Sequence, residues 1–195
     1  MAVTYVKSAR ARKDGKAPFR CTTCTNPIEP GQAYAWSQAS RFALRYSWHQ
    51  TCAAPPASML EGNDKTATVM AAFETADSDL MGIDLSAEGM DTDKLREEID
   101  SILSALSQGI QEAADMYHES ASNIEEGFGH TTEQSEQAEE NASFYEDLAS
   151  STETAADSID FDYDEAEGGW DSWVEWAEDV VQQVRDEVSG LEEHP

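Results

Sequence analysis

Two pairs of metal-binding residue types place the strongest constraint on how this chain folds. Cys21 and Cys24 form a Cys-x-x-Cys pair. His49 and Cys52 form a His-x-x-Cys pair after an intervening segment of 24 residues. Thiolate and imidazole groups are the ligands of tetrahedral zinc sites, and all three cysteines of the chain are used here. The pattern therefore predicts one structural zinc ion, because four protein ligands leave no open position for water.

The alternative is a free Cys-x-x-Cys redox pair, with His49 and Cys52 in their positions by coincidence. That interpretation does not explain why every cysteine and one histidine fall into two matched pairs. A module of about 50 residues buries little core, so the ion is expected to supply much of its folding energy.

The segment that contains these pairs is short, mixed and rich in turns. Strands are expected at residues 4–6, 33–36 and 45–48, the last running into His49. Between the first two strands, Asn26-Pro27 and Pro30-Gly31 are turn signals.

Charge divides the chain at about the same place. The whole chain has 12 Lys and Arg against 40 Asp and Glu, a net charge of -28. Residues 1–56 carry eight basic and two acidic side chains, whereas the remainder carries four basic and 38 acidic ones. A basic head and an acidic body indicate two modules with different partners. A salt-loving host is an alternative source of the acidity, but a proteome-wide bias would have acidified the head as well.

The acidic body contains apolar residues at helical spacing. Residues 57–92 predict a linker with a short helix at 66–81, and residues 93–126 predict a long helix. Asp91 or Thr92 caps its start, and the glycines at 127 and 129 end it. Its heptad-like stripe consists of Leu95, Ile99, Ile102, Leu106, Ala113 and Tyr117, with Gly109 or Ile110 in the gap.

A second helix is expected to fold back on the first. Thr131 and Gln134 fit a capping box at its start. Its stripe consists of Ala138, Ala142, Tyr145, Ala149, Thr152, Ala156 and Ile159. Two such helices joined by a short glycine turn predict an antiparallel hairpin with arms of roughly 25–30 residues, or about 40 Å.

The end of the chain predicts one more helix. Residues 157–169 are acidic, with Phe161 and Tyr163 interleaved, and are expected to be a flexible connector. Residues 170–189 predict an amphipathic helix that must bury its apolar face against the hairpin or a partner, the hairpin being the simpler choice. That face consists of Trp170, Trp173, Val174, Ala177, Val180, Val181, Val184 and Val188.

Together these patterns predict an α+β protein, in which a small zinc finger with short strands precedes a mainly α-helical acidic region. Residues 1–56 form the basic zinc-finger module and residues 57–92 the linker with its short helix. Residues 93–159 form the acidic helical hairpin, and residues 160–195 form an acidic connector and the C-terminal amphipathic helix.

Three segments of the head carry a resemblance to a known family. They are the run 3–10 with its Lys7-Ser8 step, the Cys-x-x-Cys segment 21–24 followed by Ile28 and Gly31, and the aromatic-His-x-x-Cys segment 46–52. In this order, residues 1–56 resemble a poly(ADP-ribose) polymerase-type zinc finger. The resemblance implies one zinc ion and binding to DNA breaks through basic residues and an apolar loop.

The whole chain also resembles small zinc-finger proteins of actinobacterial phages. The likeness includes an acidic helical C-terminal part with a stretch like residues 124–130, Ile-Glu-Glu-Gly-Phe-Gly-His. This second resemblance implies a phage-encoded protein that works in the cytoplasm of a host cell.

Basic and aromatic residues make the head a candidate nucleic-acid interface. Basic side chains neutralise phosphates, and an aromatic ring stacks on exposed bases. The candidate residues are Arg10, Arg12, Lys13, Lys16, Arg20, Arg41, Phe42 and Arg45, with Leu44 as a further apolar residue of the loop. The alternative is that these charges pair with the acidic body and keep the protein in solution.

The acidic body suggests other classes of function. Rows of carboxylates on a rigid hairpin imitate the phosphates of DNA and would occupy a basic groove on a host DNA-binding protein. The body would otherwise serve as a scaffold or self-associate through its heptads or its tryptophan-rich final helix, or its acidity would simply solvate the hairpin. The sequence leaves the oligomeric state open.

Several other functions find little support. Asp160, Asp162 and Asp164 have the spacing that opens a calcium loop, but Glu165 and Asp171 depart from that pattern. No constellation of catalytic residues can be assembled, so a non-enzymatic protein is expected. No apolar run approaches the ~20 residues that cross a membrane, and the N-terminus lacks the apolar core of a signal peptide. These features predict a cytoplasmic protein.

Overall fold

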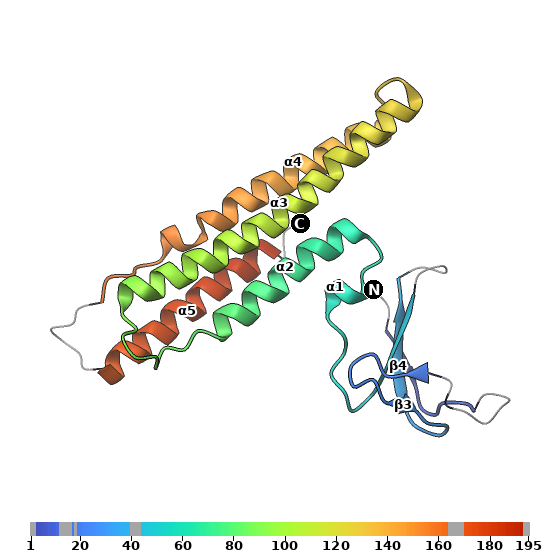
Figure 1. Ribbon diagram of the computed structural model, residues 1–195, viewed down its shortest axis with the longest axis horizontal. Coiled ribbons are helices and arrows are strands. Elements are labelled where there is room, and N and C mark those ends of the chain that lie inside the picture. The colour runs from blue at the N-terminus through green and yellow to red at the C-terminus, as the bar shows by residue number, and fades with distance from the viewer. Residues whose placement is uncertain (1–2, 12–16, 18, 40–43, 164–169, 193–195) are drawn as a thin grey trace. The chain divides into compact units, whose positions relative to one another are not determined.

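The structure is a computed structural model that describes residues 3–11, 17, 19–39, 44–163 and 170–192. As the sequence predicts, the protein is α+β, with short antiparallel strands in its first part and long helices in the remainder (Figure 1). The chain divides into two compact units, Met1–Ala67 and Thr68–Pro195. We call them the N-terminal unit and the helical unit and describe each by itself.

The N-terminal unit is built on a three-stranded antiparallel sheet in the order β1-β4-β5. The strands β1 (Thr4–Val6), β4 (Tyr34–Gln38) and β5 (Arg45–His49) confirm the three strands expected from sequence. A second, two-residue pair of β2 (Phe19–Arg20) and β3 (Pro27–Ile28) was not predicted. Strands of two residues carry no periodicity of their own, and here the turn between them holds the pair together.

A small core lies on this sheet. The register places Ala35 opposite Trp48, and both are buried. A short helix, α1 (Ala57–Leu60), adds the buried Leu60 to the same cluster. The buried members among the described residues are Ala9, Cys21, Ile28, Tyr34, Ala35, Trp48 and Leu60. So few apolar side chains supply little hydrophobic stabilisation.

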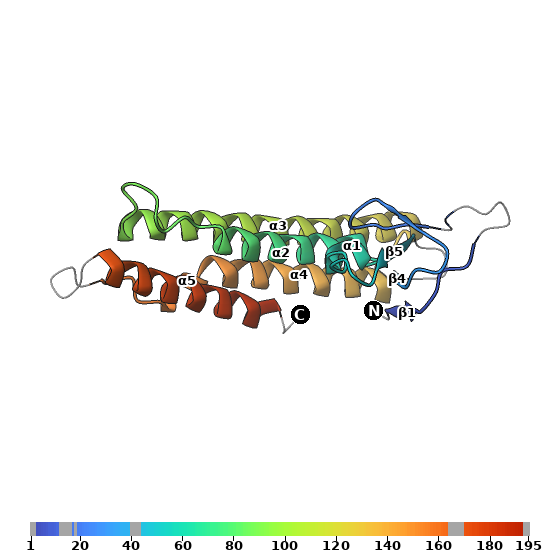
Figure 2. The same ribbon diagram turned by 90° about the horizontal axis from the view of Figure 1, so that it is seen from below.

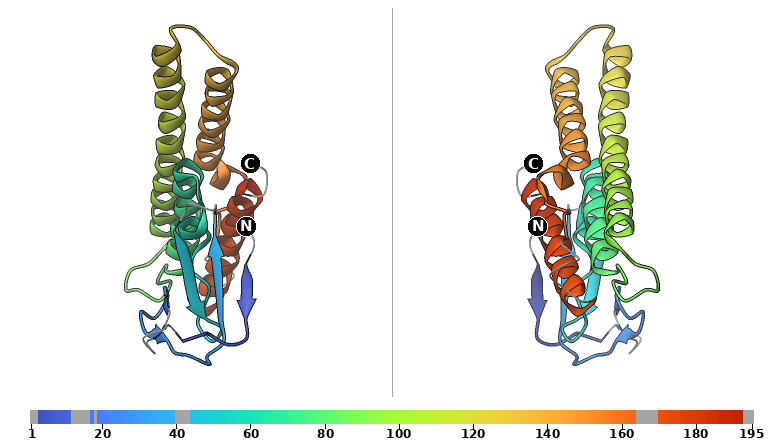
Figure 3. Two further views of the ribbon diagram at one scale, coloured as in Figure 1. Left: turned by 90° about the vertical axis from the view of Figure 1, so that its right-hand side faces the viewer. Right: turned by 90° about the vertical axis from the view of Figure 1, so that its left-hand side faces the viewer.

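The helical unit is organised around a long antiparallel hairpin. Its arms are α3 (Thr92–Phe128) and α4 (Glu133–Glu153), which lie side by side in Figures 1 and 2. The predicted hairpin is confirmed, but its arms are unequal, at 37 and 21 residues. The helices α2 (Asp64–Met81) and α5 (Trp170–Glu192) pack along part of it, and Figure 3 shows its tip extending beyond them.

The ends of the hairpin helices follow local hydrogen-bonding rules. Asp91 caps α3 by accepting a hydrogen bond from the backbone N–H of Lys94, and Gly129 ends α3 in the left-handed region with φ 72°. The capping box predicted at Thr131 and Gln134 is wrong by one residue, because the pair is Thr132 and Ser135. Ser135 is fully buried, and its hydroxyl accepts a hydrogen bond from the Thr132 N–H.

The buried face of α3 is wider than a single heptad stripe. Ile102 and Tyr117, expected in the core, are only half-buried, whereas Leu103 and Ile110 are buried. The reason is that α3 packs against helices on more than one side, so residues of two neighbouring stripes are covered. The fully or nearly fully buried residues of α3 are Leu95, Ile99, Leu103, Leu106, Ile110, Ala113, Ala114 and Ala121.

The segment after α4 is more ordered than the flexible connector that its composition suggested. Residues Ala155–Ser158 form a short 3-10 helix, so Ala156 and Ile159 lie beyond the end of α4. Phe161 is buried beneath the guanidinium of Arg96, which lies 5.3 Å from the ring centroid. Tyr163 contacts Trp176 with ring centroids 5.3 Å apart. Residues 164–169 lie outside the described part of the chain.

The final helix buries its apolar face within the helical unit, as the simpler interpretation predicted. Its residues Trp173, Ala177, Val180, Val181, Val184 and Val188 belong to the same core as α2 and α3. The indole N–H of Trp173 donates to the hydroxyl of Thr92 at 3.3 Å. Trp170, by contrast, remains 51% exposed and stacks on Trp173. None of the helices in the described ranges is both long and apolar enough to cross a membrane.

Candidate metal centre

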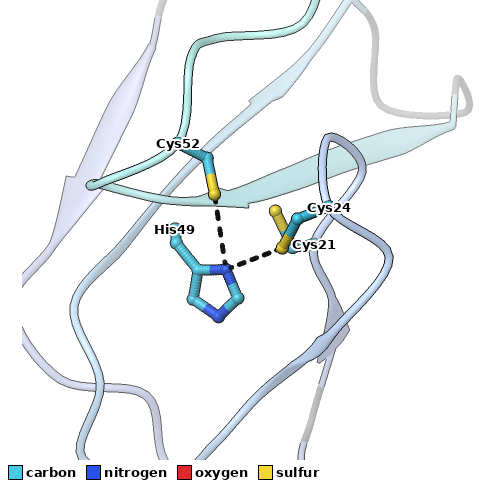
Figure 4. Close-up of side chains that lie close together, drawn as sticks. All are labelled: Cys21, Cys24, His49 and Cys52. Carbon is cyan, nitrogen blue, oxygen red and sulfur yellow. Dashed lines mark hydrogen bonds between the residues drawn. The ribbon is translucent and has the colours of Figure 1, made fainter.

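The four predicted ligands meet at one point of the N-terminal unit. The sulfurs of Cys21, Cys24 and Cys52 and one ring nitrogen of His49 all lie within 4.8 Å of one another (Figure 4). Ligands about 2.0–2.3 Å from a tetrahedral zinc ion lie about 3.3–3.8 Å apart. The Nδ1 atom of His49 is 3.5 Å from the sulfur of Cys24 and 3.8 Å from that of Cys52. The four residues are therefore positioned to hold one metal ion.

The first ligand pair lies on a tight turn between β2 and β3. The backbone N–H of Cys21 donates to the carbonyl of Asn26 at 2.8 Å, and the N–H of Thr25 donates to the carbonyl of Cys21 at 2.9 Å. Thr25 has φ 60°, a left-handed conformation that bends the chain back on itself. This turn brings two sulfurs, one deeply buried and one half-buried, to the same side of the backbone.

Thr22 ties this turn to the strand that carries the second ligand pair. Its backbone N–H donates to the carbonyl of Ser47 at 2.8 Å, and its hydroxyl accepts from the Ser47 N–H at 3.3 Å. Ser47 is two residues before His49 on β5, so its side chain lies on the same face of the strand. These hydrogen bonds hold the turn and the strand in register, which is the role of outer-sphere contacts in metal sites.

The second pair lies at the end of β5. The backbone N–H of Cys52 donates to the carbonyl of His49 at 3.0 Å. This hydrogen bond closes a turn that brings the cysteine back toward the histidine. Nearby, the hydroxyl of Thr23 donates to the carbonyl of Ala53 at 2.9 Å. These bonds connect the chain after the second pair to the turn of the first.

The pKa values of two of the thiols, Cys21 and Cys52, are shifted in opposite directions. Burial acts to raise the pKa of Cys21, but hydrogen bonds from the backbone of Cys24 and His49 outweigh it and lower the pKa to about 6. Burial, and next the neighbouring thiols of Cys24 and Cys21, raise the pKa of Cys52 to about 11. A divalent cation stabilises all three thiolates together, because coordination requires the deprotonated form.

The predicted nucleic-acid residues are only partly within the described chain. Arg10, Arg20 and Arg45 are exposed, and Arg20 donates to the carbonyl of Thr25 on the ligand turn at 3.4 Å. Leu44 is 75% exposed. Five of the predicted residues lie outside the described ranges: Arg12, Lys13, Lys16, Arg41 and Phe42.

An aromatic cluster surrounds Arg45, and the sequence pattern does not predict it. Its guanidinium lies 3.9 Å from the ring centroid of Trp36 and 4.7 Å from that of Phe19. The Phe19 ring in turn contacts Tyr34 at 5.4 Å, and the Tyr34 hydroxyl accepts from Arg45 at 3.3 Å. Tyr34 and Trp36 are two residues apart on β4, so the alternation of that strand was the signal that places them on one face.

The other candidate sites are not assembled. Among the described residues, the Cys3His cluster is the one group of side chains placed to hold a metal ion. Asp164, part of the calcium-like spacing, lies outside the described ranges. The ring nitrogens of His118 contact the carboxylates of Glu139 and Glu146, whereas the Nδ1–H of His130 donates to the carbonyl of Phe128.

Comparisons with known protein families, with characterised proteins and with solved structures found no match to this chain.

Proposed function

We propose that Cys21, Cys24, His49 and Cys52 bind one structural zinc ion, and that the N-terminal unit is a non-enzymatic binding module folded by that ion. The observation that supports this proposal best is the convergence of the four ligand atoms within 4.8 Å of one another. Three thiolates and one imidazole suit zinc in preference to magnesium or calcium, which select oxygen ligands. Four protein ligands leave no coordination position for a substrate.

Metal analysis tests the zinc assignment. The purified chain is expected to contain about one zinc per molecule, and the Cys24→Ser variant to lose most of it. Cobalt substitution would add the visible absorption of a tetrahedral thiolate site. A metal content well below one per chain, or an octahedral cobalt spectrum, would contradict the proposal.

We propose that this module binds nucleic acid. Support comes from the excess of basic residues in the first 56 positions and from Arg20, which lies beside the ligand turn. Arg45 adds a cation held on aromatic rings, an arrangement that suits contact with both phosphates and bases. The resemblance to a poly(ADP-ribose) polymerase-type zinc finger agrees with this role and favours DNA with exposed ends.

A mobility-shift series tests nucleic-acid binding. The zinc-loaded chain is compared with the double variant R20A/R45A, and with K94A/R96A as a control that removes the same charge from the helical unit. The first variant is expected to lose about tenfold or more in affinity and to lower the salt dependence by about two phosphate contacts. Equal losses for both variants, or no salt-dependent shift by the parent chain, would contradict the proposal.

A second role is favoured by the charge of the helical unit. Residues 97–184 contain 25 Asp and Glu and no Lys or Arg. Many of these carboxylates are exposed on the hairpin, among them Glu126, Glu136 and Glu140. We propose that the helical unit binds a basic protein partner, as a DNA mimic or scaffold would, because so uniform a field attracts cationic surfaces and repels nucleic acid.

A competition assay, in which the chain and DNA compete for a basic DNA-binding protein, would test this role. The chain is expected to displace DNA from such a protein in a salt-sensitive manner. Failure to displace DNA from any of a panel of host nucleoid proteins at low salt would remove support for the mimic.

A further inference from the structure

A groove follows the seam between α2 and α3 in the helical unit. It consists of two hollows of about 380 and 350 Å³ that adjoin, because Asp79 and Ile102 line both. The floor of the groove is formed by Ala72, Ala76, Ile102, Ala105, Leu106 and Gly109. Ile102 belongs to the heptad stripe of α3 but is only half-buried, so the groove exposes part of a side chain that the pattern assigned to the core.

Small residues line the groove where α2 and α3 approach each other closely. Gly109 faces Ala72 so closely that a Cβ atom at Gly109 would lie 2.7 Å from the Ala72 Cβ. Ala71, Thr75 and Ala105 are exposed beside this close approach. Short side chains on both helices therefore leave an apolar trough where larger residues would fill the seam.

The rim of the groove carries one sign of charge. Asp79, Asp84, Glu98 and Glu112 line it, and no Lys or Arg is among the lining residues that the structure describes. Hydrogen bonds from the hydroxyl and backbone of Ser86 lower the pKa of Asp84, which keeps that carboxyl ionised. The nearby Arg96 contacts Asp100 and the Phe161 ring instead.

We propose that this groove binds a basic amphipathic helix of a partner protein. The apolar side of such a helix would rest on the floor, and Lys or Arg residues on its flanks would meet the four rim carboxylates. This proposal rests on the second role given above, binding of a basic partner by the helical unit, and it names the surface and the form of that partner.

The chemistry of the groove excludes two other occupants. A second copy of this chain would bring the same acidic rim against itself in a two-fold interface, where like charges repel. An extended peptide needs donors for its backbone carbonyls, but the floor is aliphatic and the rim carboxylates only accept. A helix satisfies its own backbone hydrogen bonds, so it loses nothing on an apolar floor.

The length of the groove sets the length of the occupant. From Glu98 to Glu112, α3 rises by about 21 Å, which matches about four turns of a bound helix. A suitable probe is a synthetic 18-residue peptide with Leu and Ala on one helical face and Lys on both flanks. A scrambled peptide of the same composition, which has the same charge but no apolar face, is its control.

Binding of these peptides to the full zinc-loaded chain, measured by fluorescence anisotropy and circular dichroism, tests the proposal. The amphipathic peptide is expected to bind saturably and to gain helicity. Binding should weaken about tenfold or more in D79K/E112K, which reverses two rim charges, and in A105W, which fills the groove from an exposed position. The control E126K/E140K changes the net charge equally at the hairpin tip and should cost less than about threefold.

These outcomes distinguish binding in the groove from general attraction of basic peptides to the acidic unit. Equal losses of peptide affinity in D79K/E112K and E126K/E140K, or equal affinity for the scrambled peptide, would overturn the proposal that the groove is the binding site. The proposal that the helical unit binds basic proteins in general would still stand. Absence of saturable binding by either peptide at low salt would overturn both proposals. Unchanged far-UV circular dichroism of each variant shows that the helices themselves are intact.

Discussion

The two units of this protein differ in the size of their apolar cores and in the side chains beside them. The N-terminal unit has a buried apolar cluster of only seven described residues, and four metal-ligand side chains converge beside it. Among its described residues, the helical unit has 23 buried side chains in one continuous core, drawn from α2, α3, α4 and α5 and the segments between them. Burial stabilises the second unit, whereas the zinc ion proposed above would add coordination to the small core of the first.

This difference shows where each unit tolerates change. In the N-terminal unit the positions of a few atoms decide the fold, because Thr22 and Ser47 must align the turn with β5. In the helical unit each core side chain touches many others, so a single contact contributes a small part of the stability. The acidic surface of the helical unit is compatible with this, because its charges lie outside the core.

Removal of the metal should have the largest effect and should be confined to one unit. Chelation of zinc removes an apparent stabilisation of about 10–16 kcal/mol in small zinc modules, so the N-terminal unit is expected to unfold. In NMR spectra the dispersed amide signals of β4 and β5 should collapse, while far-UV circular dichroism retains the helical signal. Dispersed strand signals that survive complete zinc removal would show that the two units do not differ in this way.

A cavity in the helical core tests whether burial stabilises the helical unit independently of the metal centre. Leu106 is 1% exposed, so Leu106→Ala is expected to cost about 2–5 kcal/mol in the free energy of helical unfolding. The zinc content of the variant should stay at that of the parent chain. A parallel loss of zinc would mean that the N-terminal unit depends on the helical core for its stability.

Two glycines of α3 give a matched test of packing within the helical unit. A methyl group at Gly109 would meet Ala72 at 2.7 Å, so Gly109→Ala is expected to destabilise the unit by about 1–3 kcal/mol. A methyl group at Gly127 meets nothing within 4 Å, so Gly127→Ala should stabilise α3 by up to about 1 kcal/mol. Thermal melts of both variants check the difference, and shifts of the same sign would contradict the close approach of α2 and α3.

The smallest expected effect is a pH dependence at the hairpin. His118 on α3 bonds Glu139 at 2.8 Å and Glu146 at 3.1 Å on α4. The hydrogen bond to Glu146, opposed by burial and assisted by Glu139, raises the pKa of His118 above 6.5. Because the folded-state pKa is the higher one, the stabilisation is full below about pH 6.5 and is lost as the pH rises through the raised value.

Both side chains of each pair are substantially exposed, so the contribution should stay below about 1 kcal/mol. His118→Gln should therefore lower the melting temperature at pH 5.5 more than at pH 8.5. The control His130→Gln, whose ring bonds a backbone carbonyl, should show no such difference. An equal effect of His118→Gln at both pH values would exclude the charged bridge.

Local chemistry made much of the fold and the metal centre predictable. The spacing of the two ligand pairs identified the residues that converge, and Asp91 and Gly129 marked the ends of α3. These features depend on residues that are near each other in sequence or on the rules of one ion. The α+β class followed from them.

The parts that were missed depend on which neighbours a residue meets in three dimensions. Leu103 is buried and Ile102 is not, because several helices cover α3, and a single-helix pattern cannot represent that. The aromatic cluster around Arg45 joins β2, β4 and β5, whose pairing the sequence did not specify. Phe161 and Tyr163 looked like part of a flexible acidic segment because their partners, Arg96 and Trp176, are distant in sequence.

The absence of Lys and Arg over most of the helical unit also affects how the protein can be cut. Trypsin finds no site between Arg96 and Arg185, so most of α3, all of α4 and the larger part of α5 leave as one fragment of 89 residues even from a fully denatured chain. Tryptic digestion therefore reports on the N-terminal unit, on the first residues of α3 and on the last turns of α5, while the rest of the hairpin gives no signal. A glutamate-specific protease would cut at the carboxylates that trypsin ignores, and the two enzymes together would follow the opening of each unit separately.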